Sequence, residues 1–264
     1  LVIDIDGPDE PLPASSSSPS IVIKAVSKSA TPLGVTQAVA SIMLQPDNSG
    51  SIATLNVRNS RLSATGCDIL MAVEGQQYQG LLSVSAWAPY QVLLVADSVE
   101  ISANLRYSQL SASQSHDGLN VMGFVATSFR GTPKFGLSDV AASLFGDDVS
   151  LQVKARNDVA VLGCLLSASA QFSFTTHTSS LVGGKFGIRG TGIDVVIAAT
   201  AVSTVLGVAI ETEDEKTVYI ERTRFALEGA NITVRQQADQ TNSILGGVYS
   251  HKRQVEDDQK LTVT

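Results

Sequence analysis

Aspartates are the residues of this sequence whose chemistry and placement first suggest catalysis. Asp117 follows His116, Asp148 follows Asp147, and Asp194 opens an apolar run. Enzymes that cleave glycans use two carboxylates about 5 to 10 Å apart, one as acid and the other as base or nucleophile. Adjacent side chains of a strand point to opposite faces, so Asp147 and Asp148 cannot share one site. A carbohydrate-active enzyme, hydrolase or lyase, would therefore need Asp117, Asp148 or Asp194 to converge from distant segments.

Other catalytic and metal-binding patterns are missing from the sequence. The three histidines, all in polar or charged stretches, are His116, His177 and His251. None is accompanied by the Gly-x-Ser-x-Gly elbow of a serine hydrolase. The acidic run at 211–216 lacks the spaced aspartates and the central glycine of a calcium loop. We therefore expect no catalytic residue, no cofactor and no metal site.

Tyr78, Trp87 and Tyr90 form the one aromatic cluster of the sequence. Exposed in a row, these rings would stack on sugars, as in a carbohydrate-binding module. Buried, they would fill a corner of the core, and this interpretation is favoured because only 5% of the residues are aromatic. The three residues are candidate ligand contacts only if they reach the surface.

Composition and charge limit the kinds of molecule that the chain can bind. The formal charge is −7 and the sequence pI is about 4.9, which argues against nucleic acid because phosphate binding needs clustered Lys and Arg. The apolar stretch at 192–210 is interrupted by polar residues and rich in β-branched ones, so it predicts strands and no membrane span. Cys67 and Cys164 both adjoin apolar runs; we expect buried free thiols, with one long-range disulfide as the alternative.

The chain between 52 and 263 is a series of short apolar runs separated by Gly, Ser, Asp and Asn. This pattern is typical of an all-β protein. A Leu followed by a small or acidic residue recurs at unequal intervals, at Leu62, Leu110, Leu166 and Leu227. Uneven as it is, this recurrence favours a supersecondary unit that returns several times.

The order of the strands decides between two kinds of all-β architecture. The runs at 159–166 and 195–199 lack a polar face, so both sides of those strands should be covered. A parallel β-helix or solenoid is narrowly preferred, with a jelly-roll or double β-sandwich as the alternative. One short helix is predicted at 138–145, where Ser138 and Asp139 resemble an N-cap and Gly146 a C-cap. A second is allowed at 36–44, where a strand fits equally well.

Three segments are expected along the chain. Residues 1–20 form an extended arm, residues 21–250 an all-β domain with two sub-domains as an option, and residues 251–264 a charged C-terminal segment. The arm is rich in Pro and Ser, which cannot propagate a helix or a central strand. Its apolar residues would lie on the arm's own domain or on a neighbouring subunit, and they are Leu1, Val2, Ile3, Ile5 and Leu12.

The function predicted from these features is structural rather than catalytic. A Ser, Ala and Val-rich strand series with an extended arm suits a subunit of a surface layer, a filament or a particle shell such as a virion coat, or an adhesive protein. Its main partner would be a second copy of itself, with glycans as a further option, and its place would be extracellular, on a cell surface or in a virion. A carbohydrate-active enzyme and a carbohydrate-binding module are the alternatives.

Overall fold

The protein is all-β. We describe it from a computed structural model, in which the described residues are 1–11, 19, 21–26, 37–44, 52–75, 79–88, 91–114, 119–128, 133–155, 159–168, 177–199, 202–211, 216–238, 241–250 and 260–263. Every regular element among these residues is a strand, so the predicted all-β class is confirmed. The described residues include no helix long and apolar enough to span a bilayer.

The strands form two sheets, and every pairing between described strands is parallel. The six-stranded sheet contains β3 (Gln37–Leu44), β6 (Gln79–Ala88), β8 (Leu119–Ser128), β11 (Val159–Ala168), β15 (Val202–Glu211) and β19 (Thr241–Ser250). The fourteen-stranded sheet contains β1 (Val2–Asp6), β2 (Ile21–Val26), β4 (Ile52–Cys67), β5 (Ile69–Gly75), β7 (Gln91–Gln114), β9 (Pro133–Ser138), β10 (Ala141–Ala155), β12 (His177–Val182), β13 (Lys185–Thr191), β14 (Asp194–Ala199), β16 (Lys216–Glu221), β17 (Arg224–Ala230), β18 (Thr233–Ala238) and β20 (Lys260–Val263).

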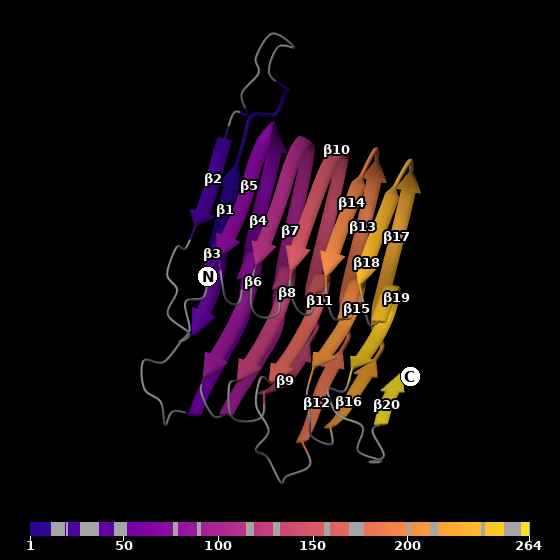
Figure 1. Ribbon diagram of the computed structural model, residues 1–264. Coiled ribbons are helices and arrows are strands. Elements are labelled where there is room, and N and C mark those ends of the chain that lie inside the picture. Colours follow the sequence, from indigo (N-terminus) through magenta and orange to yellow (C-terminus); the bar gives the residue numbers. More distant parts are fainter. Residues whose placement is uncertain are drawn as a thin grey trace.

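These strands stack as the rungs of a parallel solenoid, the architecture that was narrowly preferred from the sequence. In Figure 1 the rungs follow one another across the molecule, from indigo at one end to yellow at the other. Arg58 lies beside Asp97, and Ala141 lies beside Lys185. The stretch of chain from the first to the second member of each pair therefore makes up one rung. The recurring Leu motif has longer intervals than these pairs, and it therefore does not mark the rung.

Each rung crosses four faces in turn. The first face holds residues 52–58 and 91–97 with β9, β12, β16 and β20; the second holds β1, residues 60–67, 99–106 and 141–147, β13 and β17. The third face holds β2, β5, residues 108–114 and 149–155, β14 and β18, and the fourth is the six-stranded sheet. β7 runs through three faces and β4 and β10 through two, which makes these the longest strands of the stack.

Two corners of the rung are built from residues with left-handed backbone. Between the first and second faces, φ lies between 47° and 69° at Asn59, Ser98, Asp139, Gly183 and Arg222. Between the second and third faces, φ lies between 51° and 68° at Asp68, Tyr107, Asp148, Gly192 and Asn231. Gly, Asn and Asp tolerate this conformation best, so the turn residues of the sequence mark corners of a rung rather than hairpins.

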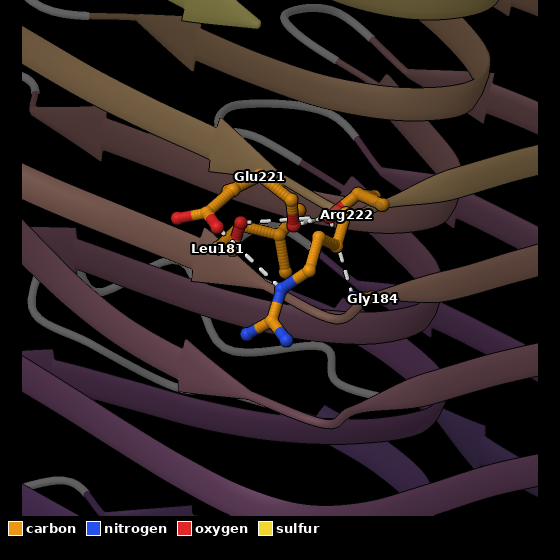
Figure 2. Close-up of polar contacts among 5 residues, drawn as sticks. Leu181, Gly184, Glu221 and Arg222 are labelled. Atoms are coloured by element: carbon orange, nitrogen blue, oxygen red, sulfur yellow. Dashed lines mark hydrogen bonds and ion pairs between the residues drawn. The ribbon is translucent and has the colours of Figure 1, made fainter. Parts of the chain in front are cut away.

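At three of these ten corners a hydroxyl residue follows the left-handed residue and binds the rung before it. The Thr223 hydroxyl donates a hydrogen bond to the Glu221 carbonyl, at 3.1 Å, and accepts one from the Gly184 backbone N–H, at 3.3 Å. Figure 2 shows this corner, where the Arg222 side chain also reaches the Glu221 carboxylate. Ser60 and Ser108 repeat the arrangement at other corners. The hydroxyl thus satisfies backbone groups that a corner takes out of the ladder.

The core lies between the faces and is made of rows of aliphatic side chains. Val, Leu, Ile and Ala predominate in the main cluster of buried residues. The six-stranded sheet is buried on its other face too, where Val125, Leu165 and Ala209 form a separate row. The expectation that the run at 159–166 is covered on both sides is confirmed for its described side chains, 161–166. The same expectation is wrong for the run at 195–199, which lies in β14 on the third face: Val196 is half-buried and Ala198 is exposed, because only alternate side chains of this strand face the core.

Glycines allow the backbones of neighbouring rungs to approach closely in the six-stranded sheet. Gly123 and Gly163 have φ of 145° and 152°, and a Cβ on either would overlap the carbonyl oxygen of the glycine in the next rung. The buried Asn120 amide donates to the Gly163 carbonyl, at 3.2 Å, and to the Phe124 carbonyl, at 3.3 Å. Close approach of backbone to backbone therefore requires glycine here.

The two predicted helices are strands. At 138–145, Asp139 is a left-handed corner and Ala141 begins β10, which pairs with β7 on one side and β13 on the other. Its side chains alternate between buried and exposed up to the next corner, as in any strand of the second face. At 36–44 the structure has β3, the strand that was the alternative there.

Candidate functional site

The aromatic cluster does not form an exposed row among the described residues. Trp87 is buried in β6, at 8% exposure, and lies beside Thr127 of β8. Tyr78 and Tyr90 lie outside the described residues. The large apolar side chains that the described chain does expose include Phe145, Tyr107 and Tyr219, which the sequence analysis did not single out.

The candidate carboxylates are placed at corners and edges. Asp148 is the left-handed residue of a corner, and Asp147 before it is exposed. Asp194 accepts two bonds from one nitrogen of Arg235, at 2.9 and 2.7 Å. Asp117, like His116 and His251, lies outside the described residues, and of His177 only the backbone is described. Among the described residues no three His, Cys, Asp or Glu side chains group as metal ligands.

Both cysteines are buried and neither forms a disulfide, as expected. Cys164 lies in β11, where burial alone raises the pKa of its thiol far above the ordinary value. Cys67 ends β4 and donates to the Asp9 carbonyl, at 3.4 Å. Neither thiol has the exposed, electropositive surroundings of a reactive cysteine.

The beginning of the arm lies on its own domain. β1 pairs with residues 61–65 of β4, and Ile3 and Ile5 pack against the core. Leu1 and Val2 are 66% and 62% exposed, and Leu12 lies outside the described residues. The Ser63 hydroxyl donates to the Asp4 carboxylate, and Arg61 pairs with it at 3.3 Å. Mainly through the Ser63 bond, these contacts lower the pKa of Asp4.

The two ends of the solenoid are the surfaces that most resemble an interaction site. At one end of the stack lie β1 and β2, and at the other β17, β18 and β19 (Figure 1). Each end leaves core-facing side chains partly exposed, Ile3, Ile5 and Ile21 at the first and Phe225, Leu227, Ile232 and Val234 at the second. The edge strands there also have backbone groups that no described strand pairs, which makes each end a template for a further rung.

The apolar residues of the two ends belong to the same rows. One row runs through Ile3, Leu62, Ile101, Ala142, Phe186 and Phe225. The next runs through Ile5, Ala64, Ala103, Leu144, Ile188 and Leu227. Phe225 and Ile3 therefore occupy the same place in the cross-section of the solenoid, as do Leu227 and Ile5.

Charged side chains on the outer surface follow the same rows. Asp6 and Glu228 are the first and last members of one row on the second face. Lys24 and Arg235 are the first and last members of a row on the third face. The two ends therefore match in their apolar rows but carry like charges at these two outer positions.

Comparison with known proteins adds no relative. No family model matches the chain, and neither a curated protein nor a solved structure matches it significantly. The site must be judged from its own residues. The end rows escaped the sequence analysis because partners a whole rung apart in the chain become visible only once the register is known.

Proposed function

We propose that this protein is a non-enzymatic structural subunit that assembles head to tail into a filament, the β17–β19 end of one copy receiving the β1–β3 end of the next. The observation that carries the proposal is the match between the apolar rows of the two ends. In the register of the stack, Phe225 of one copy would lie beside Ile3 of the next and Leu227 beside Ile5. Edge backbone groups would pair as they do between rungs.

The first face supports the same arrangement. At the second end, β16 and β17 belong to the same rung, and β20 adds one more strand to the first face by pairing with β16. At the first end, β1 adds one more strand to the second face by pairing with β4, whose residues 52–58 begin the first face. A second copy placed beyond β17 would set its residues 52–58 beside β20 and its β1 beside β17. The two edges are offset in the same sense, so one copy continues the other without a gap in any face.

The free energy available from burying the end residues predicts weak association. Burying a large apolar side chain fully is worth roughly 1.5–3 kcal/mol, and the end residues are already partly buried, so each has about 1 kcal/mol left to gain. With seven such side chains the gain falls in the range of the roughly 4–15 kcal/mol that association costs. Like charges at an exposed cross-strand pair oppose it by at most about 1 kcal/mol each. Assembly should therefore depend on concentration and strengthen with salt, which screens the charges.

A carbohydrate-active enzyme has less support. Its candidate Asp194 is held by Arg235 in an ion pair, and its candidate Asp148 forms a corner of the rung. Both residues thus have a structural role that accounts for an aspartate at their positions. The remaining candidate, Asp117, lies outside the described residues.

The test is a charge reversal at the proposed junction. Asp6→Lys changes an exposed residue and would set a cation beside Glu228 of the neighbouring copy. We expect Asp6→Lys to assemble at lower protein concentration than the wild type at low salt, with a weaker salt dependence, measured by light scattering and sedimentation velocity. Adding Glu228→Lys should restore repulsion and return the mass to that of the wild type.

Lys134→Glu, in β9 on the first face and away from both ends, is the matched control and should leave the mass unchanged. A wild type that stays monomeric at every protein and salt concentration would overturn the proposal. So would an Asp6→Lys variant whose mass is insensitive to the second change, because the junction would then not bring positions 6 and 228 together.

A further inference from the structure

A groove of about 420 Å³ crosses three strands on the outside of the second face. Its floor is made of small residues in one row, Ser143 of β10, Gly187 of β13 and Ala226 of β17. Larger side chains two residues before and after them form the two walls: Lys185 and Arg224 on one side, Phe145, Arg189 and Glu228 on the other. The groove lies across the strands, along the axis of the solenoid.

The fold does not require the gap in this floor. A Cβ on Gly187 would lie 3.5 Å from the Ala226 carbonyl oxygen and 3.9 Å from the Ala226 Cβ, which are ordinary contacts. The backbone of Gly187 is not left-handed either. This glycine therefore differs from Gly163, whose missing side chain is needed for packing, and it leaves room that a ligand could use.

The walls carry more positive than negative charge, although the whole chain has a net charge of −7. Lys185 and Arg224 lie directly beside each other in the register. Like charges in that position repel, and a bound anion would relieve the repulsion. Among the described residues the Lys185 ammonium has no ion-pair partner, whereas Arg224 pairs with Glu228 across the groove.

The second wall presents a cation that is already oriented. The Arg189 guanidinium lies over the Phe145 ring, 5.9 Å from its centre, and Phe145 is 45% exposed. A guanidinium stacked on a ring loses less freedom when it binds a carboxylate, and its forked donors match the two oxygens. The groove thus combines an apolar surface with cations on both walls.

This combination fits a sugar chain better than a peptide. β10 and β13 are paired on both sides, so an extended peptide cannot join them as a further strand, and a peptide added at the edge of β17 would run along the strands and not across them as the groove does. A pyranose ring offers an apolar face to Phe145 and the small floor, and a ring carboxylate offers an anion to Lys185 and Arg189. Neighbouring strands are about 4.8 Å apart, close to the length of one pyranose unit, so successive sugars would meet successive strands.

We propose that this groove binds an acidic polysaccharide, a chain of carboxylate-bearing pyranose units lying along the solenoid axis. Lys185 and Arg189 hold the carboxylates, and Gly187 leaves the space for the sugar ring. This proposal does not rest on head-to-tail assembly, because the groove is formed within one copy; its β17 side adjoins the proposed junction, so binding is measured at protein concentrations at which the chain is monomeric.

The test measures binding of a galacturonate oligosaccharide to the full chain by calorimetry at low salt. The same oligosaccharide with its carboxylates methyl-esterified tests the charge, and a glutamate peptide of similar length tests the class of ligand. Gly187→Val fills the floor of the groove. Gly136→Val is its matched control, since a Cβ on Gly136 meets nothing within 4 Å and lies on the first face. Lys185→Gln removes the unpaired cation.

We expect the acidic oligosaccharide to bind, with affinity falling as salt is added. Methyl esterification and Gly187→Val should each weaken binding at least about tenfold, a difference of about 1.4 kcal/mol. Lys185→Gln should weaken it severalfold and Gly136→Val not at all. No binding by the wild type, equal binding of the esterified sugar, tighter binding of the glutamate peptide or full binding by Gly187→Val would each overturn the proposal.

Discussion

The two sheets of this solenoid use one backbone arrangement for two purposes. In the middle strands of the six-stranded sheet both faces are buried, and the described side chains of β8 and β11 are hidden on either side. In the second face of the fourteen-stranded sheet only alternate side chains are buried, and the others are free to carry charge or to leave a groove. The strands pair in parallel in both. The difference shows that what covers the outer face, and not the strand itself, decides how much a position tolerates.

Glycines make the contrast sharpest. At position 163 a φ of 152° and the close backbone of the neighbouring rung both require glycine, whereas a side chain at position 136 would meet open space. Both look alike in the sequence, each beside apolar residues in a short run. Only the packing separates a glycine that the fold needs from one that it merely accepts.

The largest expected effect is that of Gly163→Ala. Its Cβ would overlap the Gly207 carbonyl; backbone strain and overpacking each cost roughly 1–3 kcal/mol, so we expect a loss of about 4 kcal/mol in the free energy of unfolding. Gly136→Ala should instead be neutral or stabilise by up to about 1 kcal/mol, because it restricts the unfolded chain. Urea unfolding of both variants gives the comparison. Equal losses would mean that the backbone conformation of Gly163 is not fixed by the neighbouring rung.

The second largest expected effect is a difference in stability loss between truncations on the outer faces of the two sheets. Leu165 is fully buried on the outer side of the six-stranded sheet, whereas Tyr219 on the first face is 46% exposed. Leu165→Ala should cost about 3 kcal/mol, within the roughly 2–5 kcal/mol of buried Leu truncations. Tyr219→Ala should cost no more than about 1 kcal/mol despite the larger side chain. Thermal and urea unfolding check both values, and a mild effect at Leu165 would show that its face is open in solution.

The strands could be predicted from the sequence better than the corners between them. The run at 159–166 has no polar face, and burial on both sides was predicted correctly for it; the same signal failed at 195–199, where Ala198 is exposed. The helix expected at 138–145 was wrong because Asp139 and Gly146 carry the local signals of helix caps, while the same residue types also form a left-handed corner and a tightly packed strand position. Local preference could not separate these alternatives, and pairing with two neighbouring strands decided between them.

The binding surfaces could not be predicted because they depend on register. Lys185 and Arg224 are distant in the chain and become neighbours only in the stack. The Leu motif pointed to a repeat, but Leu62 lies on the second face and Leu110 on the third. A search for charged or small residues that recur at the interval of one rung would have found the groove, but that interval is known only from the pairing of the strands.

The smallest expected effect is electrostatic and belongs to the exposed face. The Ser63 hydroxyl, and to a lesser extent Arg61, lower the pKa of Asp4 below its usual value of 3.8. A lowered pKa in the folded state means that these contacts stabilise the attachment of β1 above the unfolded pKa and lose their effect as the pH falls through the folded one. Cys164, in the buried part of the six-stranded sheet, remains a thiol across this range and contributes no such dependence.

An NMR titration of the Asp4 carboxyl should therefore give a midpoint below 3.8, and the protection of the β1 amides, measured relative to their intrinsic exchange rates, should fall as the pH drops through that midpoint. Ser63→Ala should raise the midpoint more than Arg61→Gln, because the hydrogen bond is the larger cause and the ion pair is exposed to solvent. If Arg61→Gln had the larger effect, long-range charge would govern β1, and its attachment should then weaken in added salt. If neither variant moved the midpoint, β1 would be held by its backbone pairing with β4 and by Ile3 and Ile5, and the exposed face would resemble the buried sheet in depending on apolar packing.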